Sequence, residues 1–125
     1  MFDDSDLIFA YSRRQALADG MLVDASATAR DAGIRYPVAL TRAVWDMYVE
    51  VPPRVHAQDE AGRLWDILWA LRHGIRAGQG DGPSLHYGLR VHNTNGRPEL
   101  VTLKCVCGPD DDGRPCLTIM LPDQD

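Results

Sequence analysis

Cysteine is scarce in this sequence: Cys105, Cys107 and Cys116 are its three copies in 125 residues. An odd number of thiols argues against a disulfide framework, and a zinc site usually takes four ligands in CxxC-like or HxxxH-like pairs. A single CxC with one distant cysteine falls short of that set. Because Cys105 and Cys107 share the alternating phase of Val101 and Leu103, we expect buried apolar cysteines, with no metal and no other cofactor.

Long apolar runs and clusters of basic residues are also missing. No stretch approaches the roughly 20 apolar residues that cross a bilayer, and the start, MFDDSD, lacks the layout of a signal peptide. We therefore expect a cytoplasmic protein without membrane contact. The net charge is −5, from 13 basic and 18 acidic residues. Without a basic surface, direct binding of nucleic acid is not expected. A DNA mimic would need a continuous acidic surface, whereas the acidic residues here gather at the chain ends.

Familiar catalytic motifs are absent too. The sequence contains no GxSxG, HExxH, GxxxxGK[ST] or strand-linked GxGxxG pattern. The segment GQGDG resembles a phosphate loop only in composition, because it lacks the lysine and the preceding strand. We assign no catalytic residue and keep an enzyme with an unrecognised site, for example a modifying transferase, as an alternative.

What is present is an ordinary globular composition, with 45% hydrophobic and 25% charged residues. The chain fits a single domain over residues 1–125. Leu7–Ala10 reads as a short strand, followed by a helix that Ser12 and Gln15 cap and Gly20 ends.

Two further short helices are expected before residue 53. Asp24 or Ser26 caps the first, which Gly33 ends. Thr41 caps the second, which two prolines end. Its apolar face comprises Val44, Trp45, Tyr48 and Val49. The alternation in MYVEV leaves open a strand within 38–51 instead.

The longest element is a helix of about 15 to 19 residues in QDEAGRLWDILWALRHGIRAG. Asp59 and Arg63 form a favourable pair one turn apart, and Trp69 extends the apolar surface, which indicates cover on more than one side. The apolar stripe at helical spacing comprises Leu64, Trp65, Leu68, Leu71 and Ile75.

The period then changes to two, which predicts three strands with one apolar face each, in SLHYGLRVHN, LVTLKCVCG and CLTIML. Asn95-Gly96 predicts a tight hairpin that Arg97 and Pro98 can lengthen, and GPDDDGRP forms the second connection. The predicted fold is α+β and two-layered. An antiparallel sheet of three to four strands, the C-terminal meander plus the N-terminal strand, packs on the long amphipathic helix with shorter N-terminal helices.

Two charged groups are candidate partner-binding residues. The acidic turn of Asp110, Asp111 and Asp112 does not have the ligand spacing of an EF-hand, so we treat it as a solvated turn or a contact surface. Four basic side chains are expected on the sheet face opposite the core, where they form either a patch for an acidic partner or an ordinary wet face. They are His86, Arg90, His92 and Lys104.

Two blocks, YSRRQALADGMLVDASATARDAG with YPVALTRAVW and QDEAGRLWDILWALR with VTLKCVCGPDDDGRPCLTIMLP, resemble a family of small proteins of unknown function from phages, plasmids and other mobile elements. The resemblance implies stoichiometric binding to a host protein or nucleoprotein complex, as in an inhibitor of a host defence system of the anti-CRISPR or anti-restriction type. A homodimerising accessory module, joined through an exposed strand edge, is a further alternative.

Overall fold

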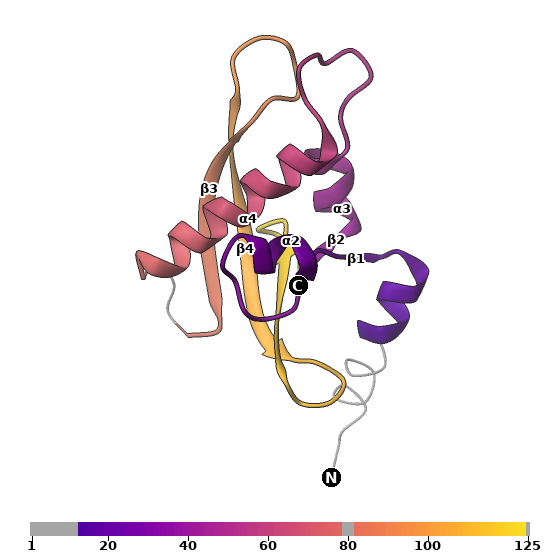
Figure 1. The fold of residues 1–125 in the computed structure, drawn as a ribbon, viewed down its shortest axis with the longest axis vertical. Coiled ribbons are helices and arrows are strands. Elements are labelled where there is room, and N and C mark those ends of the chain that lie inside the picture. The colour runs from indigo at the N-terminus through magenta and orange to yellow at the C-terminus, as the bar shows by residue number, and fades with distance from the viewer. Residues whose placement is uncertain (1–12, 79–81, 125) are drawn as a thin grey trace.

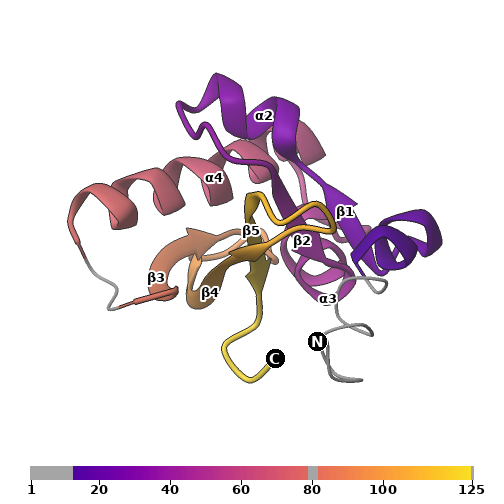
Figure 2. The ribbon, with the colours of Figure 1, turned by 90° about the horizontal axis from the view of Figure 1, so that it is seen from below.

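The computed structural model describes residues 13–78 and 82–124, and it is an α+β protein (Figures 1 and 2). Residues 13–19 form a helix that ends at Gly20 with φ +79°, as predicted. The elements that follow are β1 (Leu22–Asp24), α2 (Ser26–Asp31), β2 (Val38–Thr41), α3 (Arg42–Val44) continuing as the π-helix η1 (Trp45–Val49), α4 (Glu60–Arg76), β3 (Ser84–Val91), β4 (Glu99–Pro109) and β5 (Pro115–Met120).

The described strands form one sheet in the order β1-β2-β5-β4-β3, with β2 and β5 parallel and the other pairs antiparallel. The predicted meander of β3, β4 and β5 is therefore confirmed, but the sheet has five strands and is mixed, not three to four and antiparallel. β1 was not predicted, and β2 was covered only by the alternative of a strand within 38–51, because strands of three and four residues are too short to display a period of two. The predicted strand at Leu7–Ala10 and the Ser12 cap lie outside the described residues.

The long helix α4 has 17 residues, within the predicted length. Asp59 is its N-cap and accepts a hydrogen bond from the backbone N–H of Gly62 at 2.6 Å, so it does not form the predicted pair with Arg63. Leu64, Leu68 and Leu71 of the predicted stripe are buried as expected, but Trp65 and Ile75 are exposed. The side chains that α4 buries are Arg63, Leu64, Ile67, Leu68 and Leu71.

Local signals at the shorter helices were read correctly in most cases. Thr41 Oγ1 accepts a hydrogen bond from Val44 N at 3.4 Å and begins α3. The alternative of a strand within 38–51 holds only for β2 itself, because MYV is helical. The predicted cap of α2 was wrong, because its N-cap is Ala25, which makes no side-chain cap hydrogen bond. Asp24 instead accepts from the N–H and the hydroxyl of Ser26, at 3.1 and 2.6 Å, just before the helix.

Gly33 follows α2 at φ +91°, and a Cβ there would lie 2.9 Å from Arg72 Nε. Glycine is therefore favoured at this position by the left-handed backbone, and a larger residue would also have to displace the Arg72 side chain.

The core lies between the sheet and the layer formed by α2 and α4, which cover the same face of the sheet (Figure 2). Burying each large aliphatic side chain contributes roughly 1.5–3 kcal/mol, so this layer supplies most of the favourable burial. The largest side chains with no exposed surface are Leu40, Ile67, Leu68, Leu71, Leu103 and Ile119. Over the described residues, no helix is both long enough and apolar enough to traverse a bilayer.

Arg63 is the one charged side chain in this part of the chain that is buried, with 4% of its surface exposed. Its guanidinium donates to the carbonyl oxygens of Val49 at 3.1 Å and His92 at 2.6 Å, and to Asn93 Oδ1 at 2.6 Å. Asn93 in turn donates to the carbonyl of Met47 at 3.0 Å. Burial lowers the pKa of Arg63, but a guanidinium remains charged at neutral pH. These bonds join η1, α4 and the β3–β4 connection.

Replacing Arg63 by lysine is expected to lower the free energy of unfolding by about 2–4 kcal/mol, because an ammonium cannot reach three divergent acceptors and leaves some of them buried without a donor. Urea unfolding followed by tryptophan fluorescence measures the change. The control is Arg30→Lys on the exposed end of α2, which should stay within about 0.5 kcal/mol. Equal stability of both variants would show that the Arg63 bonds contribute nothing.

Candidate interaction surface

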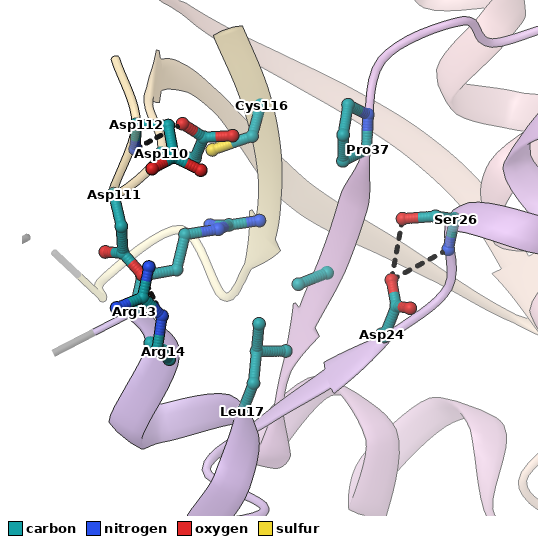
Figure 3. A pocket seen from close by; sticks show the side chains of 11 residues that line it. Arg13, Arg14, Leu17, Asp24, Ser26, Pro37, Asp110, Asp111, Asp112 and Cys116 are labelled. Carbon is teal, nitrogen blue, oxygen red and sulfur yellow. Dashed lines mark hydrogen bonds and ion pairs between the residues drawn. The ribbon is translucent and has the colours of Figure 1, made fainter. Parts of the chain in front are cut away.

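The acidic turn of Asp110, Asp111 and Asp112 joins β4 to β5 and faces the helix at residues 13–19 (Figure 3). The Asp110 carboxylate accepts from the backbone N–H groups of Arg114 and Asp112, both at 2.9 Å. The hydrogen bond from the backbone of Arg114, and to a lesser extent that from Asp112, lowers the pKa of Asp110. This carboxylate is therefore ionised, and its hydrogen bonds stabilise the turn.

Asp111 also pairs with a side chain of the same protein. Its Oδ2 lies 3.4 Å from Arg14 Nε, and its Oδ1 is buried and accepts no hydrogen bond within the described part of the chain. The neighbouring Arg13 donates to Thr118 Oγ1 at 2.7 Å. Asp111, Arg13 and Arg14 line a pocket of about 510 Å³ between the 13–19 helix, the turn and β2 (Figure 3). The turn is thus partly covered by the protein's own arginines.

The structure brings three of the four predicted basic residues to one sheet face. His86 lies directly opposite Lys104 in the β3–β4 register, and Arg90 follows on the same face of β3. Lys104 is not free, because its ammonium donates to the carbonyl oxygen of Gln124. His92 lies past the end of β3 and near Asp66 of α4: burial raises the pKa of Asp66, and His92 opposes that rise.

The acidic turn and the basic face do not form one surface. Asp110 follows Lys104 by six residues along β4, a separation of about 20 Å in an extended strand. A partner that touched both groups would therefore have to follow most of the length of β4.

The cysteines differ from one another in exposure. Cys105 is buried as predicted, but the predicted burial of Cys107 is wrong, because Cys107 is exposed. Cys116 is buried as well. Cys107 keeps the phase of Cys105, but it lies beyond the position of β4 that pairs with Ser84, the first residue of β3, where the helix layer no longer covers the sheet. Burial raises the pKa of Cys105 to about 12 and also raises the pKa of Cys116, so both are protonated thiols at neutral pH. No cluster of three or more metal-ligating side chains occurs among the described residues.

Native thiol labelling is expected to modify one cysteine rapidly, because Cys107 alone is accessible and a protonated, buried thiol is a poor nucleophile. Reaction with a disulfide reagent at pH 8, followed by absorbance, should give one equivalent per native chain and three in denaturant. The variant Cys107→Ser should lose the rapid phase entirely. Rapid modification of two or three native cysteines would contradict the assigned burial.

A surface that sequence reasoning missed runs along the exposed side of α4. We call it the aromatic strip: Trp65, Trp69, Arg72 and His73. The two indoles stack with centroids 5.6 Å apart and planes inclined by 15°, His73 meets Trp69 edge-on at 5.0 Å, and the Arg72 guanidinium lies 4.9 Å from the Trp69 ring centre. Trp65 and Trp69 are 37% and 39% exposed, so this side of α4 is not covered as predicted.

One sequence signal could have revealed the strip. Ile67 completes a narrower stripe with Leu64, Leu68 and Leu71, at spacings of three and four residues. That stripe leaves Trp65 and Trp69 together on the opposite side of the helix.

Beside the strip, a groove of about 570 Å³ separates α4 from β3. Its apolar lining includes Trp69, Tyr87 and Leu89, and Ala70 and Gly74 leave room because they are small. Both ribbon views show the C-terminal half of α4 projecting beyond β3 (Figures 1 and 2). We call this cavity the α4–β3 groove. Asp66 and His73 are the ionisable groups at its rim.

Burial is the largest cause of the raised pKa values among the described residues. The raised pKa values of Tyr87, Cys105 and Cys116 follow from burial and keep those groups protonated. The aromatic strip, in contrast, combines tryptophan and arginine, the residue types that dominate the energetics of protein interfaces. The described residues thus form a small α+β fold with an exposed aromatic surface on α4.

Comparison with known proteins places the chain in a family. Residues 1–125 match the family of unknown function DUF6573, to which this chain therefore belongs. No curated protein and no solved structure matches the chain.

Proposed function

We propose that this protein acts by stoichiometric binding to a host protein or nucleoprotein complex, through the aromatic strip of α4. The observation that carries the proposal is the stacked pair of Trp65 and Trp69, each more than one-third exposed, with Arg72 against the second ring. Tryptophan and arginine supply most hot-spot energy in interfaces, since truncating one such residue there costs about 2 kcal/mol or more.

The biological setting of the proposal is a mobile genetic element, and the proposed role is inhibition of a host defence complex. The resemblance of the sequence to small phage and plasmid proteins supports this setting. A binder needs no catalytic constellation, which agrees with the buried, protonated state of Cys105, Cys116 and Tyr87.

A stacked tryptophan pair can also receive the bases of single-stranded nucleic acid. Such sites need a cationic groove that follows the phosphates. Here the α4 surface carries Glu60 and Asp66 as well as Arg72, and the chain has a net charge of −5. We therefore assign the strip to a protein surface.

The double variant Trp65→Ala/Trp69→Ala is expected to abolish inhibition. In a bacterial strain whose CRISPR or restriction system lowers phage plaque counts, the wild-type protein should restore plaques and the variant should not. Met21→Ala is the matched control, because Met21 is 62% exposed and lies outside the strip. Restoration by the double variant, at equal expression, would refute a role for the strip.

Two other functions are separated by simple measurements. A homodimerising module would change its elution volume with concentration in size-exclusion chromatography, whereas a monomeric binder would not. An enzyme would inactivate a defence complex at substoichiometric amounts. A stoichiometric binder needs about one copy per complex, which titration of inhibition against complex concentration determines.

A further inference from the structure

One outer edge of the sheet is formed by β3, and half of its backbone groups are not bonded to any other described strand. Among the described strands β3 pairs with β4 alone and therefore forms one edge of the sheet. It contains eight residues, pairs with β4 in unbroken register, and has no proline. Edges of this length are templates for the addition of another strand unless something blocks them.

The register shows which backbone groups point outward. Cys107 N donates to Pro83 O at 2.7 Å, and in an antiparallel pair hydrogen-bonded positions alternate with non-bonded ones. Odd-numbered residues of β3 therefore exchange hydrogen bonds with β4. The even-numbered residues direct their N–H and C=O groups away from β4, and these are Ser84, His86, Gly88 and Arg90.

The helix α4 covers one side of the space beside this edge. The C-terminal half of α4 projects over it (Figures 1 and 2), and the α4–β3 groove lies between that helix and Tyr87, Gly88 and Leu89 of the edge strand. A strand added to β3 would alternate its side chains between this groove and the opposite face. The added strand would thus gain main-chain bonds from β3 and apolar contacts with Trp69.

A second copy of this chain does not suit the same edge. Antiparallel pairing of two β3 strands is related by a two-fold axis normal to the sheet, so both copies of α4 would lie on one face. Each helix projects beyond its own β3 (Figure 1), and the two would compete for the same space. The occupant is therefore a slender extended segment.

Positively charged side chains lie on the opposite face of the sheet at this edge. On the face away from α4, β3 presents the exposed side chains His86 and Arg90, four residues apart, beside Lys104 of β4. No aspartate or glutamate of β3 or β4 shares that face, because Glu99 has the opposite phase. Cross-strand neighbours of opposite charge stabilise a pair.

We infer that β3 and the α4–β3 groove capture an extended peptide segment of a partner protein by strand addition, and that this segment alternates apolar and acidic residues. Apolar side chains opposite Tyr87 and Leu89 enter the groove, and acidic ones lie opposite His86 and Arg90. The captured strand thus carries two acidic residues four positions apart with apolar residues at the second and fourth of those five positions. The inference rests on the proposed binding function and names the recognised chemistry.

Selection of displayed random 12-residue peptides on the full chain tests the recognised pattern. The expected outcome is enrichment of sequences with the alternating apolar and acidic spacing and without central proline. Enrichment of helical or basic sequences, or no enrichment at all, overturns the inference.

A matched pair of variants at Gly88 tests the geometry with a selected peptide. Gly88→Pro removes an N–H that points away from β4 and so spares the internal ladder. Loss of that bond and the added ring should weaken peptide binding at least about tenfold. Gly88→Ala keeps the N–H, and its Cβ would lie 3.6 Å from Val101 O, an ordinary contact, so binding should stay within about threefold. Equal affinity of the two variants overturns strand addition.

A charge exchange keeps the inference testable if the proline variant does not fold. His86→Glu/Arg90→Glu should bind a peptide whose acidic residues are changed to lysine more tightly than the selected peptide, which reverses the wild-type preference. An unchanged preference contradicts the predicted register. Amide hydrogen exchange supplies a direct readout, because the N–H groups of residues 86, 88 and 90 should become protected only with peptide bound.

The outcome of the strand-capture test can be distinguished from the outcome of the test of the proposed function. Loss of inhibition in Trp65→Ala/Trp69→Ala with full inhibition in Gly88→Pro would leave stoichiometric binding intact and reject strand capture. Inhibition that survives both changes would reject both.

Discussion

The Arg63 guanidinium holds together three segments that lie far apart in the chain. It contacts backbone of η1 and of the β3–β4 connection, and its own residue belongs to α4. Unpaired burial of a charge is costly, so the acceptors of Arg63 must remain in place whenever α4 is packed. A second pair of hydrogen bonds joins the β3–β4 connection to the segment before α4. Asn95 Oδ1 accepts from His56 N at 2.8 Å, and Asn95 Nδ2 donates to the Arg54 carbonyl oxygen at 2.7 Å. These contacts hold the first turns of α4 against the β3–β4 connection, and the apolar core fixes the angle at which the rest of the helix crosses the sheet.

That angle has two consequences at the surface. It carries the C-terminal half of α4 past the edge of the sheet (Figure 1), which creates the α4–β3 groove, and it turns Trp65 and Trp69 toward solvent. Exposed edges promote aggregation unless charges or cover protect them. Here α4 covers one face of β3, and the charged side chains of His86 and Arg90 lie on the other face. Both features would hinder edge-to-edge pairing of two β3 strands, and in the strand capture that we propose they leave space for one extended peptide.

Much of the local structure could be predicted because it depends on near neighbours. Thr41 begins a helix, Gly20 and Gly33 end two, and alternation marks β3, β4 and β5. The candidate site was less predictable. The acidic turn and the basic strand face were recognised as features, but not that Arg14 covers Asp111 or that Lys104 bonds to Gln124. The partners of those side chains come from segments distant in sequence, and no local pattern reports them.

The sequence by itself determined the α+β class, the C-terminal meander and the length of α4, since propensity, capping and periodicity act over a few residues. Only the tertiary structure decided that β1 and β2 enter the sheet, that Arg63 is buried, and that β3 lies at the edge beneath a projecting helix. Sheet order and helix angle depend on packing across the whole core. Trp69 of the stacked pair and the edge strand β3 therefore come to line one groove only when the chain folds.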